Sequence, residues 1–153
     1  MAVNPIPPGF HSVAPMLAIR DAAAAIEFYK RAFGAVETLR MADPSGTIAH
    51  AEIKIGDSVV MMAEENPQYN ASPQTLGNSS VILALYVPDV DAVVQRAVAA
   101  GAKVVIPVTD QFYGDRTGRI VDPYGHIWIV STHQEDVSPQ EMQKRFANLM
   151  KSP

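Results

Sequence analysis

The chain has 153 residues, a formal net charge of −4 and no cysteine. This length fits one domain, or two small fused modules, with a core that needs no covalent staples. The absence of cysteine excludes disulfide bonds, thiolate metal sites and cysteine nucleophiles. No cluster of lysine and arginine stands out, which argues against nucleic acid and anionic membranes as partners.

Residues 1–10 are rich in proline and have no periodicity, which predicts an extended N-terminal arm. The arm contains neither a basic region nor a long apolar run, so we expect no signal peptide. No stretch of the chain is apolar over the length that a membrane span requires. We therefore expect a cytoplasmic protein without a membrane partner.

The segment 11–63 has the pattern of a strand, a helix and three strands. Residues 12–19 alternate as a strand, and Pro15 inside it predicts an edge position. Asp21 is a good N-cap for a helix over 22–33. Further strands are expected at 36–41, 47–55 and 58–63, the last two joined by a short turn at Gly56-Asp57.

The polar segment 64–78 has no periodicity and is long for a connection in a compact domain, so it is predicted to link two modules. The pattern of strand, helix and strands then returns. The expected elements are strands at 80–87 and 104–108, a helix at 90–100, and a hairpin within 112–133.

That last hairpin is the best marked element of the chain. Its turn, Asp122-Pro123-Tyr124-Gly125, has the residue types that a β-turn prefers at each position. The strand after the turn is rich in β-branched and aromatic residues. Beyond it, within 134–153, Ser138 and Glu141 form a capping box with Pro139 between them, which predicts a C-terminal helix.

Two halves of the chain repeat the same features at a near-constant offset. The helix-entry residues Asp21 and Asp89 are 68 positions apart, and the closing residues Gly34 and Gly101 are 67 apart. Such an offset indicates an internal duplication. The predicted fold class is α+β: two tandem βαβββ modules form an open curved mixed sheet around a cleft, within one structural domain overall. The modules are 11–63 and 79–133.

Two sequence motifs carry a resemblance to a known family. One is Gly-Asp-Arg-x-Gly-Arg-Ile-x-Asp-Pro-Tyr-Gly-His-x-Trp over 114–128, and the other runs from Ile48 through Glu52 to Gly56-Asp57-Ser58. Over about residues 11–133 the chain resembles the vicinal oxygen chelate superfamily, the glyoxalase, bleomycin resistance protein and extradiol dioxygenase group, and within it the PhnB-like branch. The superfamily contains both enzymes and non-catalytic binding proteins, so the resemblance does not fix the function.

The resemblance implies four positions for metal ligands, two in each module. In this sequence they fall on Ala14, Met61, Ile82 and Ile129. None of these side chains suits a hard divalent ion, because three are apolar and the fourth is a thioether. We therefore expect metal-independent function and no cofactor.

Among the histidines, His50 is the candidate for a functional role. Alternation predicts that Ala49, Ala51 and Ile53 face the helix of the module, which places His50 on the concave face. There it is either a structural histidine or a polar group or base of a pocket. It is also the best candidate for a catalytic residue.

The predicted concave face is apolar with a few polar groups, the usual composition of a small-molecule pocket. Methionines on it suit an adaptable surface. Residues at the start of the last hairpin would lie at the mouth of such a pocket. The candidate ligand-binding residues are Met16, His50, Met61, Tyr86, Phe112, Tyr113, Arg116 and Ile129.

Three functions stay open. The first choice is metal-independent binding of a small apolar or aromatic molecule in the concave cleft. The alternatives are an enzyme of the same superfamily, a lyase, isomerase or dioxygenase that depends on a metal or uses His50, and an interaction module without a ligand. We also expect a homodimer, because open sheets leave edge strands and the C-terminal helix adds the apolar residues Met142, Phe146, Leu149 and Met150.

Overall fold

The structure is a computed structural model that describes residues 2–152. It divides into two compact units, which are described separately below. The first consists of the residues up to Ser80 together with Pro123–His126, and the second of Val81–Asp122 together with the residues from Ile127 on. No helix of the described chain is long and apolar enough to cross a membrane.

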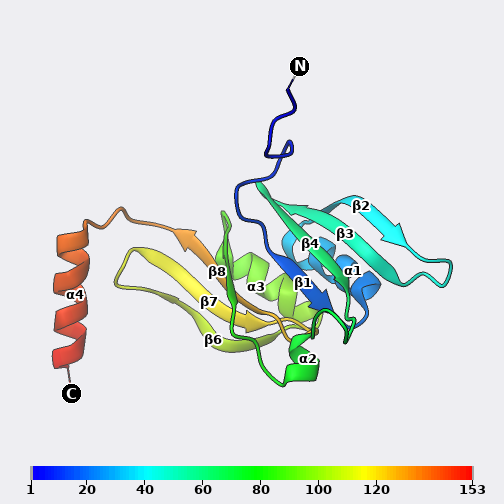
Figure 1. Ribbon diagram of the computed structural model, residues 1–153. Coiled ribbons are helices and arrows are strands. Elements are labelled where there is room, and N and C mark those ends of the chain that lie inside the picture. The colour runs from blue at the N-terminus through cyan, green and yellow to red at the C-terminus, as the bar shows by residue number, and fades with distance from the viewer. Residues whose placement is uncertain (1, 153) are drawn as a thin grey trace. The chain divides into compact units, whose positions relative to one another are not determined.

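The first unit contains a four-stranded mixed sheet in the order β1-β4-β3-β2 (Figure 1). Strand β1 runs parallel to β4, and the other pairs are antiparallel. Strand β1 is an edge strand, as predicted, but it begins at Met16, so Pro15 precedes the strand and does not lie inside it. The elements are β1 (Met16–Ile19), α1 (Ala22–Phe33), β2 (Val36–Ala42), β3 (Ile48–Ile55), β4 (Ser58–Glu64) and the short helix α2 (Pro73–Leu76).

Helix α1 packs on one face of this sheet, and its caps explain its length. The Asp21 carboxylate accepts a hydrogen bond from the Ala24 amide at 3.2 Å, and Gly34 ends the helix in the left-handed conformation. Fully buried side chains from α1, such as Tyr29, meet fully buried side chains from the sheet, such as Ile53 and Met62. The core of the first unit therefore lies between α1 and the sheet.

A bulge changes the predicted facing of one residue of β3. The pairing of β2 with β3 shifts between Met41 and Ala42, so the alternation that holds from Ala51 onward does not extend to the start of the strand. Ile48 is buried there and Ala49 is exposed. The expectation that Ala49 faces the helix is wrong, whereas His50 keeps its predicted face.

The second unit repeats the topology of the first, with the sheet order β5-β8-β7-β6 and a parallel β5–β8 pair. This confirms the two predicted βαβββ modules. Buried Trp128 and Val130 pack on the α3 side of the sheet, and the Trp128 indole donates to the Asp122 carboxylate at 3.0 Å. The elements are β5 (Ile82–Tyr86), α3 (Val90–Ala99), β6 (Lys103–Asp110), β7 (Asp115–Val121), β8 (Ile127–His133) and α4 (Pro139–Lys151).

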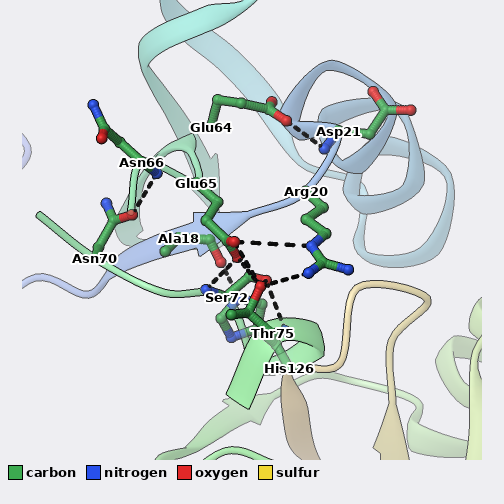
Figure 2. Close-up of polar contacts among 10 residues, drawn as sticks. All are labelled: Ala18, Arg20, Asp21, Glu64, Glu65, Asn66, Asn70, Ser72, Thr75 and His126. Carbon is green, nitrogen blue, oxygen red and sulfur yellow. Dashed lines mark hydrogen bonds and ion pairs between the residues drawn. The ribbon is translucent and has the colours of Figure 1, made fainter. Parts of the chain in front are cut away.

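The segment predicted as an aperiodic linker is tied down by Glu65. Figure 2 shows its carboxylate at the centre of the polar contacts that order the chain around α2. It accepts from the Ser72 amide at 2.6 Å and from the Thr75 hydroxyl at 2.5 Å, and the Arg20 guanidinium lies 3.8 Å away. Ser72 is fully buried. These hydrogen bonds lower the pKa of Glu65 to about 2. We call Glu65, Ser72, Thr75 and Arg20 the loop clamp.

The turn after β7 belongs to the first unit. The Tyr124 ring meets the Phe28 ring edge-on, with centroids 6.2 Å apart. The imidazole Nε2 of His126 lies 3.1 Å from the Ala18 carbonyl oxygen (Figure 2). A carbonyl only accepts, so Nε2 must carry the proton. His126 is therefore a satisfied structural histidine.

Helix α4 begins as its capping box predicts, with the Ser138 hydroxyl accepting from the Glu141 amide at 3.2 Å. None of its side chains is buried. Figure 1 shows it (red) standing apart from the sheet of its own unit. It is held there by Arg145, which donates to the Phe112 carbonyl and to the Glu135 carboxylate.

Candidate functional site

Each sheet has one face covered by its helix and one turned away from it, which we call the far face. On the first sheet the far face carries Met16 beside Met61, which are partners in the β1–β4 register. Glu52 is the partner of Met61 on β3. His50 lies next along β3 on the same face, and its Nε2 is 3.3 Å from the Glu52 carboxylate. Two thioethers and a His–Glu pair are thus brought together.

The far face of the second sheet has a polar end built around Asp115. Asp115 is only 5% exposed. One oxygen accepts from the Tyr86 hydroxyl at 2.7 Å, and the other lies 2.6 Å from His133 Nδ1. The other imidazole nitrogen, Nε2, lies 2.8 Å from the exposed carboxylate of Asp136. Strands β5, β7 and β8 each contribute one residue to this Tyr86–Asp115–His133 cluster.

The charge of Asp115 sets the protonation of its two partners. A hydrogen bond to a carboxylate favours the form that can donate. The hydrogen bond to Asp115, supported by the one to Asp136, raises the pKa of His133 above its ordinary value. The hydrogen bond to Asp115 likewise raises the pKa of Tyr86. The cluster therefore holds a protonated phenol and favours an imidazolium.

Beyond the cluster the far face along β7 and β8 passes through paired hydroxyls and one arginine to an apolar end. The next cross-strand pair is Thr117 with Ser131, whose buried hydroxyls lie 2.9 Å apart. Arg119 then faces Ile129, and the last pair is wholly apolar, Val121 with Ile127. A half-buried apolar end and a charged end on one surface can hold a small molecule and fix its orientation.

The predicted site residues divide between the two units. Met16, His50 and Met61 lie on the far face of the first sheet, and Tyr86 and Ile129 on that of the second. Arg116 lies on the opposite side of β7, where its guanidinium donates to Asp91 at 2.7 Å and to Asp110 at 3.0 Å. The hydrogen bond from Arg116 lowers the pKa of Asp91. Arg116 thereby ties the sheet to α3.

Phe112 and Tyr113 lie in the loop between β6 and β7. Their rings meet edge-on with centroids 5.2 Å apart, and Phe112 also contacts Phe146 of α4 at 5.7 Å. Phe112 lines a shallow hollow of about 310 Å³ against that helix. The other lining residues are Arg145, Asn148, Leu149 and Ser152.

Asp115 and His133 were not predicted as site residues, although the sequence contained a signal for them. The turn centred on Tyr124 places the two strands in a register that pairs residues equally distant from it. Asp115 and His133 are both nine positions from Tyr124, and they are partners in the sheet. Extending the hairpin register from its turn would have found the pair.

The positions that the family resemblance assigns to metal ligands do not fit a divalent ion. Met61, Ile82 and Ile129 offer a thioether and two hydrocarbon side chains, and Ala14 offers a methyl group. Within residues 2–152 no group of three or more His, Cys, Asp or Glu side chains is arranged to hold a metal.

Comparisons with known proteins identify the family. An uncharacterized protein of Mycobacterium tuberculosis is 41% identical over 152 residues, covering 97% of this chain and 87% of that protein. The crystal structure of TioX from Micromonospora sp. ML1 matches with a TM-score of 0.63 and 30% identity, over 84% of this chain and all of that one. A PhnB protein from Bacillus cereus, titled a putative 3-demethylubiquinone-9 3-methyltransferase, shares the fold with a TM-score of 0.63 and 17% identity, over 80% and 99% of the two chains. The model of the Glyoxalase/Bleomycin resistance protein/Dioxygenase superfamily matches residues 9–130, and the chain therefore belongs to that superfamily.

Proposed function

We propose that this protein binds a small apolar or aromatic molecule on the far face of its second sheet, without a metal ion. The observation that carries the proposal is the gradient along β7 and β8. It runs from the Tyr86–Asp115–His133 cluster, through paired hydroxyls, to the isoleucines Ile127 and Ile129. Such a surface buries an apolar body and orients it by one polar end.

The chemistry of the family positions supports binding without a metal. A divalent ion needs oxygen or nitrogen ligands at these positions, and the chain has none there. The methionine pair Met16 and Met61 on the first far face is also suited to adaptable apolar contact.

An isomerase or lyase is a second candidate, favoured by the His50–Glu52 pair. A carboxylate 3.3 Å from an imidazole can orient the ring and support its action as a base. Such an enzyme would need its substrate on the far face of the first sheet rather than the second.

Titration with the neutral aromatic fluorophore N-phenyl-1-naphthylamine tests the proposal. We expect saturable binding that a chelator leaves unchanged and that Ile129→Glu weakens at least tenfold. Val98→Glu is the matched control, because Val98 is an exposed residue of α3 away from the far face. The milder Ile129→Thr serves if the charged variant does not fold. No binding by the folded protein, or loss of binding on metal removal, would overturn the proposal.

A further inference from the structure

Arg119 is half-buried and stands in apolar surroundings on the far face of the second sheet. It faces Ile106 on β6 and Ile129 on β8 in the strand register. Its neighbours along β7, Gly118 and Ile120, are buried on the side of α3. Its strand partners on both sides are therefore hydrocarbon residues, on the surface that we assign to ligand binding.

The Nε of Arg119 is buried, and among the buried side-chain nitrogen and oxygen atoms of residues 2–152 it is the one without a hydrogen-bond partner. Leaving a charged donor buried and unpaired is unfavourable, and buried polar groups are normally paired. Arg116, three residues earlier, shows the usual arrangement, since two aspartates hold it. An acceptor for Arg119 is expected from outside the described chain.

The acids of the same hairpin cannot supply that acceptor. Asp115 is four residues away along the strand, about 13 Å at the usual rise of a strand, and both of its oxygens are occupied. Asp122 accepts from the Trp128 indole in the core. The positive charge of Arg119 is thus left for a ligand.

We propose that Arg119 recognises an acidic group of the bound molecule, so that the ligand is an apolar or aromatic acid. This rests on the proposed function above. A guanidinium presents a planar fork that matches a carboxylate and also stacks on aromatic rings. The isoleucines on either side contact the apolar body, while the terminal nitrogens of the guanidinium, which are not buried, donate to the anion.

Two fluorophores that differ by one anionic group test this inference. These are N-phenyl-1-naphthylamine and its sulfonated relative 1-anilinonaphthalene-8-sulfonate. We expect the sulfonate to bind the unmodified protein more tightly, and Arg119→Gln to weaken it at least tenfold while changing the neutral probe less than about twofold. Arg119→Lys should restore part of the loss. Arg96→Gln, on α3 and away from the far face, should change neither.

The pH dependence of sulfonate affinity distinguishes recognition by Arg119 from recognition by the imidazolium of His133. Arginine stays charged throughout the accessible range, so sulfonate affinity should be constant from about pH 6 to 9 and should fall with added salt. A loss of affinity that follows the titration of His133, or equal losses for both probes in Arg119→Gln, would overturn the inference. An Arg119→Gln variant that keeps its affinity for the sulfonate but changes its oligomeric mass would also overturn the inference. The acceptor for Arg119 would then come from a second copy of the chain. Failure of the neutral probe to bind at all would instead overturn the proposed function.

Discussion

The Asp115 carboxylate lies 2.6 Å from His133 Nδ1, and the two residues join the first position of β7 to the last position of β8. The carboxylate is buried while the imidazole is half exposed. The buried carboxylate of Asp115 thus orients the exposed imidazole of His133 and favours its protonated form.

The substitution His133→Gln should destabilise the protein in a pH-dependent way. The folded-state pKa of His133 is raised by Asp115 and Asp136, so its stabilising contribution is fully present below its ordinary value of 6.5 and is lost as the pH rises through the raised value. The melting temperature of the variant should fall below that of the unmodified protein by more at about pH 5.5 than at about pH 8.5. Tyr86, whose pKa is also raised by Asp115, stays protonated across this range. An equal deficit at both pH values would contradict the prediction.

Removing the charge of Glu65 should loosen the loop clamp at neutral pH. Hydrogen bonds from Ser72 and Thr75 lower the pKa of Glu65 from 4.5 to about 2, so its stabilising effect is present above 4.5 and disappears as the pH falls toward 2. Glu65→Gln should therefore unfold at lower urea concentration at neutral pH and should match the unmodified protein at the acid end. Glu27→Gln, an exposed acid on α1, is the control. Faster amide exchange around α2 in Glu65→Gln alone would identify the segment that loosens.

Truncation of two neighbouring methionines should destabilise the protein to different extents. Met62 is fully buried against α1, whereas Met61 lies on the far face. Met62→Ala should cost about 2–5 kcal/mol of the free energy of unfolding, through lost burial and a cavity. Met61→Ala should cost clearly less. Denaturant titrations of both variants measure the difference, and similar losses would show that the far face of the first sheet is part of the core.

The protein is proposed to form a homodimer through α4. The helix has no buried side chain, and its apolar residues Phe146 and Leu149 are 45% and 54% exposed. Sedimentation equilibrium should give twice the mass of one chain, and Phe146→Glu with Leu149→Glu should give a folded monomer. Arg31→Glu, an exposed substitution on α1, should leave the mass unchanged. A monomeric unmodified protein would contradict the proposal.

The features that local chemistry determines were predicted well. Asp21 and Gly34 cap the first helix at both predicted ends, Ser138 starts the last one, and Trp128 lies in the core. The repeat of these signals was sufficient to predict two βαβββ modules. Each of these signals acts over a few residues, where propensity and capping dominate.

What the sequence analysis missed depends on residues that are distant in the chain. The loop clamp joins Arg20 to Glu65 and Thr75, so a segment without periodicity is nonetheless ordered by a buried serine and a carboxylate. Ala49 was misplaced because a bulge at that residue of β3 interrupts the alternation. For the site, strand alternation identified the residues of the far face. The lack of a hydrogen-bond partner for Arg119 Nε can be recognised only from the side chains that surround it in the structure.

The four residues Pro123–His126 bear on how the duplicated chain could have evolved. They come from the second repeat, yet Tyr124 completes the aromatic packing around Phe28, and His126 donates to the backbone of β1. A gene split between the repeats would separate the first half from residues that its core uses. A substitution at Phe28 is likewise constrained by a residue almost a hundred positions away.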